Sequence, residues 1–210
     1  GRQAMEFVGF SNIDQWDMTT VAVSVALMLI LLTMRDAGRD AFRRGGGTAH
    51  LLVSADSSPL VAVLNGIFYA NPPRQQLTWS KYLQIKESFP WEWAIPTQLG
   101  DSVRGQPVVA TTIDYLTRFQ PAPDAPWTLA QGRFCEAPFE AVLGADAARK
   151  TRLRLGSSFL LTHGAGGHGD EGHHHHDHAD FPCTVVGILE PTGSPHDRAV
   201  FVDLETSWIV

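Results

Sequence analysis

The clearest feature of the hydrophobic pattern is an uncharged run from Met18 to Met34. Its 17 residues, MTTVAVSVALMLILLTM, are apolar on all sides of a helix, with Asp17 before them and Arg35 and Asp36 after them. A helix of about 17 apolar residues is the shortest that crosses a bilayer core. A signal peptide would instead have basic residues before the run and a small-residue cleavage site after it. A buried core helix is the second alternative for so short a run. The all-round apolar character favours a membrane span over both.

Charged residues continue the helical pattern beyond this run. Residues 35–44, RDAGRDAFRR, alternate in charge as a solvated helix does, and the three glycines at 45–47 are expected to end it. The sequence therefore predicts a transmembrane and stalk helix over residues 18–47, preceded by an N-terminal segment of residues 1–17. Four arginines in the stalk would place it in the cytoplasm by the positive-inside rule.

The rest of the chain has the pattern of a mixed α/β (α+β) domain. We expect helices at Pro59–Tyr69, opened by its proline, at Thr78–Phe89, capped by Thr78, and at Ala145–Arg152. Short apolar runs predict strands at residues 50–54, 108–112, 140–143, 157–162, 181–189 and 199–204. The proline-rich stretch PAPDAP, residues 121–126, predicts a connector and a subdomain boundary.

A histidine-rich segment, residues 163–180, interrupts this pattern between two strands that are expected to pair without it. It holds seven histidines, four acidic residues and five glycines, and no residue that forms an apolar core. Imidazole and carboxylate groups at this density suit zinc, nickel and copper. The candidate ligands are His163, His168, His173, His174, His175, His176, His178 and Asp177. Because many arrangements have similar energy, we expect weak, adaptable zinc binding and no cofactor that the fold requires. The alternative is a solvated insert without a metal.

Composition and motifs exclude several other functions. A hydrophobic content of 44% in 210 residues is enough for a core, and a net charge of -6 without clustered Lys and Arg argues against a nucleic-acid partner. Residues 144–151, GADAARKT, resemble a phosphate-binding loop, but Arg149 replaces the second glycine that would let the backbone wrap a phosphate. Neither G-x-S-x-G nor H-E-x-x-H occurs. We therefore expect that the chain is not an enzyme.

The two cysteines, Cys135 and Cys183, leave two alternatives open. In an oxidising compartment they would form a disulfide that closes a loop of about 50 residues. The other alternative is two free, buried thiols.

Several stretches together resemble the MacB/FtsX-like ABC-transporter permeases, in the branch with a MacB-like periplasmic core domain. The most specific are GDSVRG followed by a Thr-Thr pair, and VVGILEPTGSPHDRAV. The others are LLVSADSSPL, TWSKYLQIK, WAIPTQLGDSVRGQPVVATTIDYL, the QGR turn at 131–133, EAVLGADAARKTRLRLGSSFLL and CTVVGILEPTGSPHDRAVFVDLE. They cover most of residues 20–205.

This resemblance implies a periplasmic domain with a porter-like part, residues 48–120, and an inserted, mostly β lobe, residues 127–210. It places most of the chain in the periplasm of a bacterium, anchored in the inner membrane, although the four arginines of the stalk would favour the cytoplasm. The chain would be part of a longer permease. The implied partners are a cytoplasmic ABC ATPase, a second permease copy, and a periplasmic or outer-membrane lipoprotein.

The resemblance also implies a mechanical function, in which ATP-driven motion of the stalk helices opens or closes the periplasmic domains. Relatives are linked to zinc uptake, lipoprotein release or peptide export. The alternative is an FtsX-like signalling or scaffold module that controls a periplasmic partner.

Overall fold

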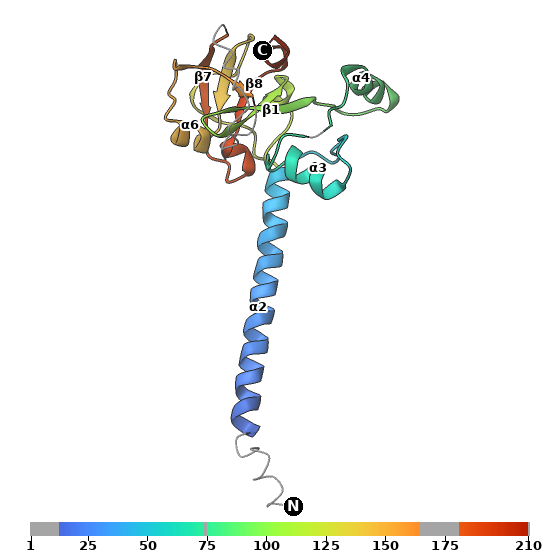
Figure 1. Ribbon diagram of the computed structural model, residues 1–210, viewed down its shortest axis with the longest axis vertical. Coiled ribbons are helices and arrows are strands. Elements are labelled where there is room, and N and C mark those ends of the chain that lie inside the picture. The colour runs from blue at the N-terminus through green and yellow to red at the C-terminus, as the bar shows by residue number, and fades with distance from the viewer. Residues whose placement is uncertain (1–12, 74, 164–180, 210) are drawn as a thin grey trace, which may run out of the picture. The chain divides into compact units, whose positions relative to one another are not determined.

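The computed structural model describes residues 13–73, 75–163 and 181–209 (Figure 1). The elements are α2 (Ile13–Gly46), α3 (Pro59–Gly66), α4 (Trp79–Ser88), β1 (Thr97–Val103), β2 (Gln106–Thr111), α5 (Asp114–Thr117), β3 (Leu129–Gly132), β4 (Glu140–Leu143), α6 (Ala145–Thr151), β5 (Ser158–Phe159), β6 (Thr162–His163), β7 (Cys183–Leu189), the 3-10 helix η1 (Pro195–Arg198), β8 (Val200–Asp203) and α7 (Leu204–Ile209). The chain divides into two compact units, Gly1–Phe42 and Arg43–Val210. The last turn of α2 therefore belongs to the second unit.

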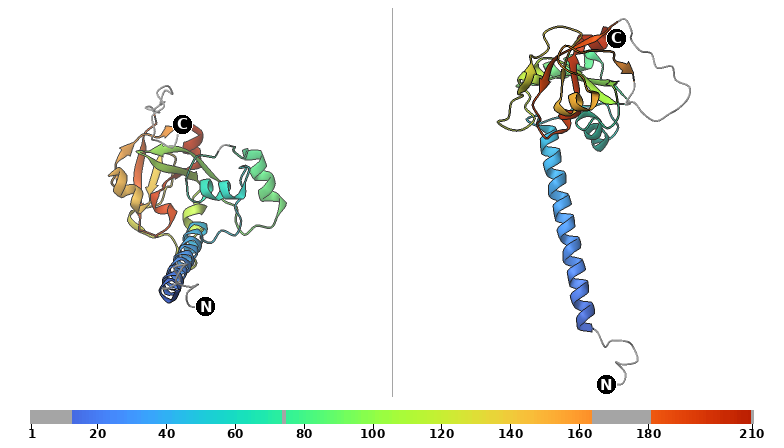
Figure 2. Two further views of the ribbon diagram at one scale, coloured as in Figure 1. Left: turned by 60° about the horizontal axis from the view of Figure 1, so that its bottom comes forward. Right: turned by 90° about the vertical axis from the view of Figure 1, so that its left-hand side faces the viewer.

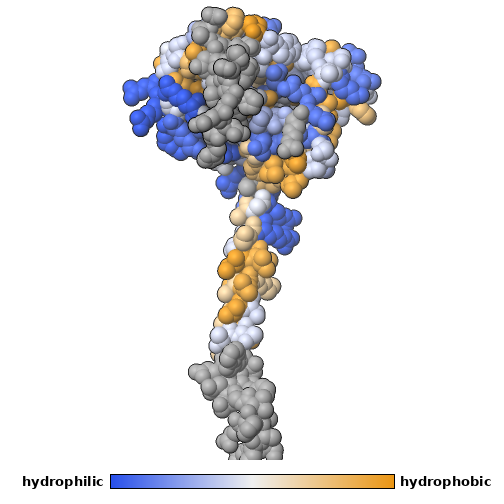
Figure 3. Space-filling view, viewed as in Figure 1, coloured by the Kyte–Doolittle hydropathy of each residue, from blue (hydrophilic) through white to orange (hydrophobic). Residues whose placement is uncertain are grey.

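Most of the first unit is helix α2, which confirms the predicted helix and begins before Met18. The part from Met18 to Gly46 is long and apolar enough to cross a membrane, and the apolar window that identifies it is not covered by other described residues. Leu31, for example, is 67% exposed. Figure 3 shows these side chains as an apolar stretch along the helix. So much exposed apolar surface on a single helix is expected when lipid surrounds it.

The second unit is built on one mixed sheet with the strand order β3-β7-β4-β8-β2-β1-β6, in which β5 also pairs with β7. The pairs β2 with β8 and β4 with β7 are parallel, whereas the others are antiparallel. Figure 2 shows red strands from the end of the chain among green and yellow strands from earlier parts. The sheet therefore includes strands from both sides of residues 121–126. The assignment of residues 48–120 and 127–210 to the two lobes of the family stays a prediction.

The central strands have consecutive apolar residues because both faces of the sheet are covered there. In β8, Val200 and Val202 join one buried cluster with Ala147 of α6, while Phe201 between them joins a second cluster with Tyr115 of α5. Successive side chains of a strand point to opposite faces, so a strand that is buried on both sides has no polar face. The continuous apolar runs of the sequence thus correspond to the middle of the sheet.

Helices α3 and α4 lie on the same side of the sheet (Figures 1 and 2). Their predicted starts are confirmed, since Ser58 and Thr78 accept hydrogen bonds from backbone N–H groups in the first turns. The predicted strand at residues 50–54 is wrong. These residues form no strand, and Leu51 is 61% exposed because no strand lies beside it to pair with. Strands β1 and β3 were not predicted.

The predicted strand at residues 157–162 is two short strands. The first, β5, pairs with β7 through Phe159 and Cys183 as expected, whereas β6, directly before the histidine-rich segment, pairs with β1. Both cysteines are free thiols, which settles the alternatives left open above. Burial raises the pKa of Cys135 to about 12 and that of Cys183 to about 11. The thiols are therefore protonated at neutral pH and are poor nucleophiles.

Candidate functional site: the end of the long helix

The end of α2 is held inside the second unit by close backbone contacts. Gly45 is buried, and a Cβ atom there would come within 2.6 Å of the side chain of Ile67. Gly47 has a φ of +51°, and a Cβ atom there would lie 2.2 Å from the carbonyl oxygen of Gln120. Only glycine fits this turn without displacing its neighbours. The glycines that were expected to end the helix therefore also bring its end against the domain.

Backbone hydrogen bonds fix the chain directly after the helix. The Gly47 N–H donates to the carbonyl of Arg43 at 3.1 Å, as in a helix C-cap. The Thr48 N–H donates to the carbonyl of Gln120 at 3.0 Å, and the Gln120 N–H donates back to the Thr48 hydroxyl at 3.0 Å. This reciprocal pair joins the end of α2 to the segment that follows α5.

His196 of η1 is the side chain that connects the helix end to the core. Its Nε2 lies 3.0 Å from the carbonyl oxygen of Gly45, and its Nδ1 lies 2.6 Å from the hydroxyl of Tyr69 and 3.3 Å from that of Tyr115. Because a carbonyl oxygen only accepts, Nε2 carries the hydrogen and donates to Gly45. In the neutral ring Nδ1 then accepts from Tyr69. We call His196, Gly45, Tyr69 and Tyr115 the junction cluster.

The junction cluster is largely buried and uncharged. His196 is 2% exposed, and its ring lies 5.4 Å from the ring of Phe119 and 5.8 Å from that of Trp127. Burial lowers the pKa of His196 to about 4, although the hydrogen bond to Gly45 opposes this shift. Burial also raises the pKa values of Tyr69 and Tyr115. At neutral pH all three side chains are therefore neutral and act only through hydrogen bonds and packing.

The loop that presents His196 is ordered by a buried carboxylate. Asp197 accepts from the backbone N–H groups of Thr192 and Gly193, at 2.9 and 2.8 Å, and from the Thr192 hydroxyl at 2.7 Å. The Ser194 hydroxyl caps η1 by accepting from the His196 N–H. On the other side, a Cβ atom at Gly144 would lie 2.6 Å from the carbonyl oxygen of His196. The distinctive stretch TGSPHD thus forms a loop whose side chains set the position of the histidine.

The structure leaves the predicted metal ligands untested. His163 ends β6, where its backbone pairs with Asp101 of β1. His168, His173, His174, His175, His176, His178 and Asp177 lie outside the described residues. Within residues 13–73, 75–163 and 181–209, no three His, Cys, Asp or Glu side chains come together to hold a metal ion.

The junction cluster was not predicted from the sequence. Gly45 and Tyr69 lie 151 and 127 residues from His196 along the chain, so no local spacing links them. The available signal was the stretch TGSPHD, which places a single histidine between a proline and an aspartate. A single histidine of this kind is no specific signal.

A long exposed apolar helix whose last turn is bonded into an α/β domain defines a membrane-anchored extramembrane domain. The model of the MacB-like periplasmic core domain family matches residues 18–209, and the chain belongs to this family. It is therefore an ABC-transporter component of the permease type, with a periplasmic domain, and the family implies an ATPase partner. The resemblance found in the sequence is confirmed. None of the curated proteins matches the chain.

Proposed function

We propose that the chain is the mechanically driven part of an ABC permease and that the junction cluster transmits motion of α2 to the periplasmic domain. In this proposal a separate cytoplasmic ATPase supplies the force, two permease copies act together, and the chain itself makes and breaks no bonds. The observation that carries the proposal is the bond from His196 Nε2 to the carbonyl of Gly45, which joins the last turn of the helix to the loop before β8.

Three properties of the junction cluster support transmission. The turn at Gly47 lies against the carbonyl oxygen of Gln120, and backbone is less able to move aside than a flexible side chain. His196 is packed among aromatic rings, and η1, the 3-10 helix that carries it, is followed after one residue by the central strand β8. Closely packed interiors transmit displacement, because their side chains have few alternative arrangements. A shift of Gly45 would therefore move η1 and the sheet along with it.

Hydrogen exchange on the permease that contains this chain, assembled with its ATPase in lipid nanodiscs, tests the proposal. Addition of a non-hydrolysable ATP analogue should change exchange at the amides of residues 43–48 and of residues 192–203. In His196→Ala the change should persist at residues 43–48 and disappear at 192–203. His50→Ala is the matched control, since His50 is exposed and lies close to the helix end in the sequence.

Two results would contradict the proposal. If the analogue changes nothing beyond residue 48 in the unmodified permease, the domain is not driven through this end of the helix. If His196→Ala responds like the unmodified protein, the force passes through other contacts. A His196→Gln variant, whose amide can both donate to Gly45 and accept from Tyr69, should retain part of the response.

We also propose that the histidine-rich segment collects zinc or a related divalent ion near the transport path. The support is its composition and the pairing of β5 with β7, which lie before and after the segment in the chain and pair without it. Zinc, lipoproteins and peptides are the candidate substrate classes, and a periplasmic or outer-membrane lipoprotein is the candidate partner on the outer side.

A further inference from the structure

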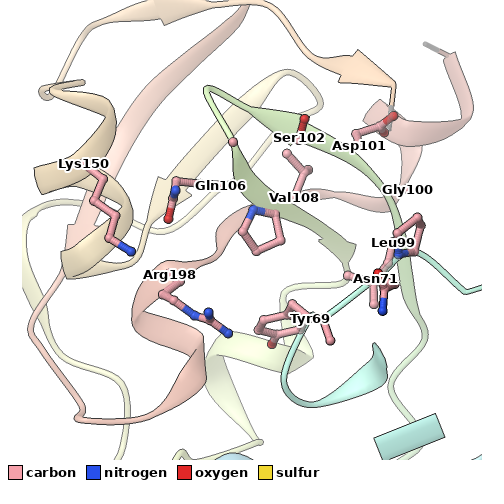
Figure 4. Close-up of a pocket in the computed structure, with 14 residues that line it drawn as sticks. Tyr69, Asn71, Leu99, Gly100, Asp101, Ser102, Gln106, Val108, Lys150 and Arg198 are labelled. Carbon is pink, nitrogen blue, oxygen red and sulfur yellow. The ribbon is translucent and has the colours of Figure 1, made fainter. Parts of the chain in front are cut away.

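The second unit contains a cavity of about 270 Å³ between the β1–β2 hairpin, the segment after α3, the end of α6 and η1. Figure 4 shows the side chains of Lys150 and Arg198 extending toward it from one side, with Tyr69 at its lower edge. Its volume lies just below the range of about 300–1,000 Å³ that is typical of small-molecule sites. The occupant is therefore expected to be no larger than about one amino-acid residue.

The two cations of this cavity have no carboxylate partner among the described residues. Lys150 and Arg198 form none of the ion pairs in this part of the chain, whereas the adjacent Arg149 pairs with Asp146. Arg198 donates one N–H to the carbonyl of Phe68 at 2.7 Å, which fixes the guanidinium and leaves its other N–H groups for a ligand. Two cations that converge on a cavity from different elements are suited to bind an anionic group.

The charge of the lining indicates how much negative charge the ligand carries. Asp101 is the only carboxylate in the described lining, and it lies on the side of the cavity away from Lys150 (Figure 4). Two positive charges and one negative charge leave a net charge of +1, which matches a monoanion such as a carboxylate better than a phosphate dianion. The walls next to the cations include apolar side chains, such as Tyr69 and Val108. They suit a small apolar body attached to the anionic group.

Gln106 adds a requirement for a hydrogen-bond donor. Its Oε1 is buried and accepts no hydrogen bond from the described protein atoms. A buried oxygen without a partner costs roughly 1–3 kcal/mol, so the Gln106 amide gains free energy if its side chain turns toward the cavity, where an N–H group on a ligand can reach the oxygen. The same amide group lies on the side of the cavity where Lys150 enters (Figure 4). A ligand that has a carboxylate and an N–H group one or two bonds away therefore fits the lining, because the cations bind the carboxylate and Gln106 accepts from the N–H.

We propose that this cavity binds the carboxylate of an amino-acid unit, with Lys150 and Arg198 holding the carboxylate and Gln106 accepting from the ligand N–H. The unit is either a free amino acid or the last residue of a peptide, since both present this chemistry. Asn71, also in the lining, contributes an amide at the opposite wall. The proposal goes beyond mechanical transmission and does not depend on it.

Titration of the whole chain, labelled with nitrogen-15 and held in detergent micelles, tests this site. N-acetyl-L-alanine should give saturable shifts at the backbone amides of Asn71 and Gln106. Its neutral amide, N-acetyl-L-alaninamide, should give none. Lys150→Ala should weaken binding roughly tenfold, since the hydrogen bond lost is charge-assisted. Arg149→Ala is the matched control, because it removes the same charge from the neighbouring position outside the cavity, and its affinity should stay within about twofold.

Two further measurements distinguish a free amino acid from a peptide terminus and test the role of Arg198. Tighter binding of L-alanine than of N-acetyl-L-alanine indicates a free amino acid, and the opposite order indicates a peptide terminus. Arg198→Lys, which keeps the charge but loses the planar fork, should also weaken binding. The proposal is overturned if no saturable shifts occur, if the neutral amide binds equally well, or if Arg149→Ala weakens binding as much as Lys150→Ala. Tighter binding of inorganic phosphate than of both carboxylates would also overturn it.

Discussion

Acidification should destabilise the domain through His196. Its pKa is about 4 in the folded protein, because the ring is buried among aromatic side chains, and the unperturbed value is 6.5. Between these two values the unfolded chain binds a proton that the folded chain does not, so unfolding becomes easier as the pH falls. The stabilisation is complete above about pH 6.5 and is lost toward pH 4. A difference of about 2.5 pKa units corresponds to roughly 3 kcal/mol.

The groups around His196 do not obscure this effect. Tyr69 and Tyr115 have pKa values raised by burial, so both stay neutral throughout the acid range. Asp197 lies next to His196 in sequence and favours its protonated form, but less strongly than burial opposes it. The seven histidines of residues 163–180 are present in both proteins when the comparison variant differs only at position 196, so their contribution cancels in the difference.

The assay is urea unfolding of the whole chain in detergent, followed by tryptophan fluorescence at pH values from 7.5 to 4. His196→Gln keeps a donor and an acceptor in place of the ring but does not titrate. The unmodified chain should lose roughly 3 kcal/mol more than His196→Gln over this range. His50→Gln, at an exposed histidine, should behave like the unmodified chain. Parallel curves for the unmodified chain and His196→Gln would refute the assignment of a buried, neutral imidazole.

Three further predictions concern the helix end, the histidine-rich segment and the topology. Gly47→Ala should lower the free energy of unfolding by roughly 1–3 kcal/mol, since its Cβ would meet the Gln120 carbonyl. Gly46→Ala is the control and should not lower it, because the space around Gly46 is open. Equal urea midpoints for the two variants would contradict this prediction. Deletion of residues 164–179 should abolish zinc binding in calorimetry without changing the urea midpoint, and the affinity of the intact chain should fall as the pH drops through about 6.5. Unchanged zinc binding would leave the segment a solvated insert, and unfolding would make it structural. Alkaline phosphatase fused after Ile209 should be active and a fluorescent protein fused there should be dark, because we expect this part of the chain in the periplasm. The reverse result would support the cytoplasmic location that the stalk arginines favour.

Local signals in the sequence predicted helices α2, α3, α4 and α6 but not the short helices α5 and α7. Thr78 was expected to cap α4, and its hydroxyl accepts from the Lys81 N–H, because a helix start depends on residues only three positions apart. The doubly buried strands β2, β4 and β8 were found for a similar reason, since continuous apolar runs are typical of the centre of a covered sheet. The strand at residues 50–54 failed because an apolar run does not reveal whether another strand lies beside it.

The elements that were missed depend on distant parts of the chain. β1 contains Gly100, Asp101 and Ser102 and has no apolar run, and it becomes a strand because β2 and β6 pair with it on either side. β3 is an exposed strand at the edge of the sheet. His196 and the cavity around Lys150 and Arg198 likewise arise only when segments more than 40 residues apart meet. The spacing of residues within one segment does not indicate which distant segments it will pack against.

The position of β8 in the sheet has a consequence for how the protein is made. This strand, Val200–Asp203, lies between β2 and β4, so both of these strands have an unpaired edge until it arrives. Its parallel pairing joins Val108 to Val200, a non-local contact of the kind that slows folding. If α2 enters the membrane first, the sheet cannot close until β8 has crossed. During that interval its open edges are available to proteases and to other unfolded chains, which makes export the step at which this protein is most vulnerable.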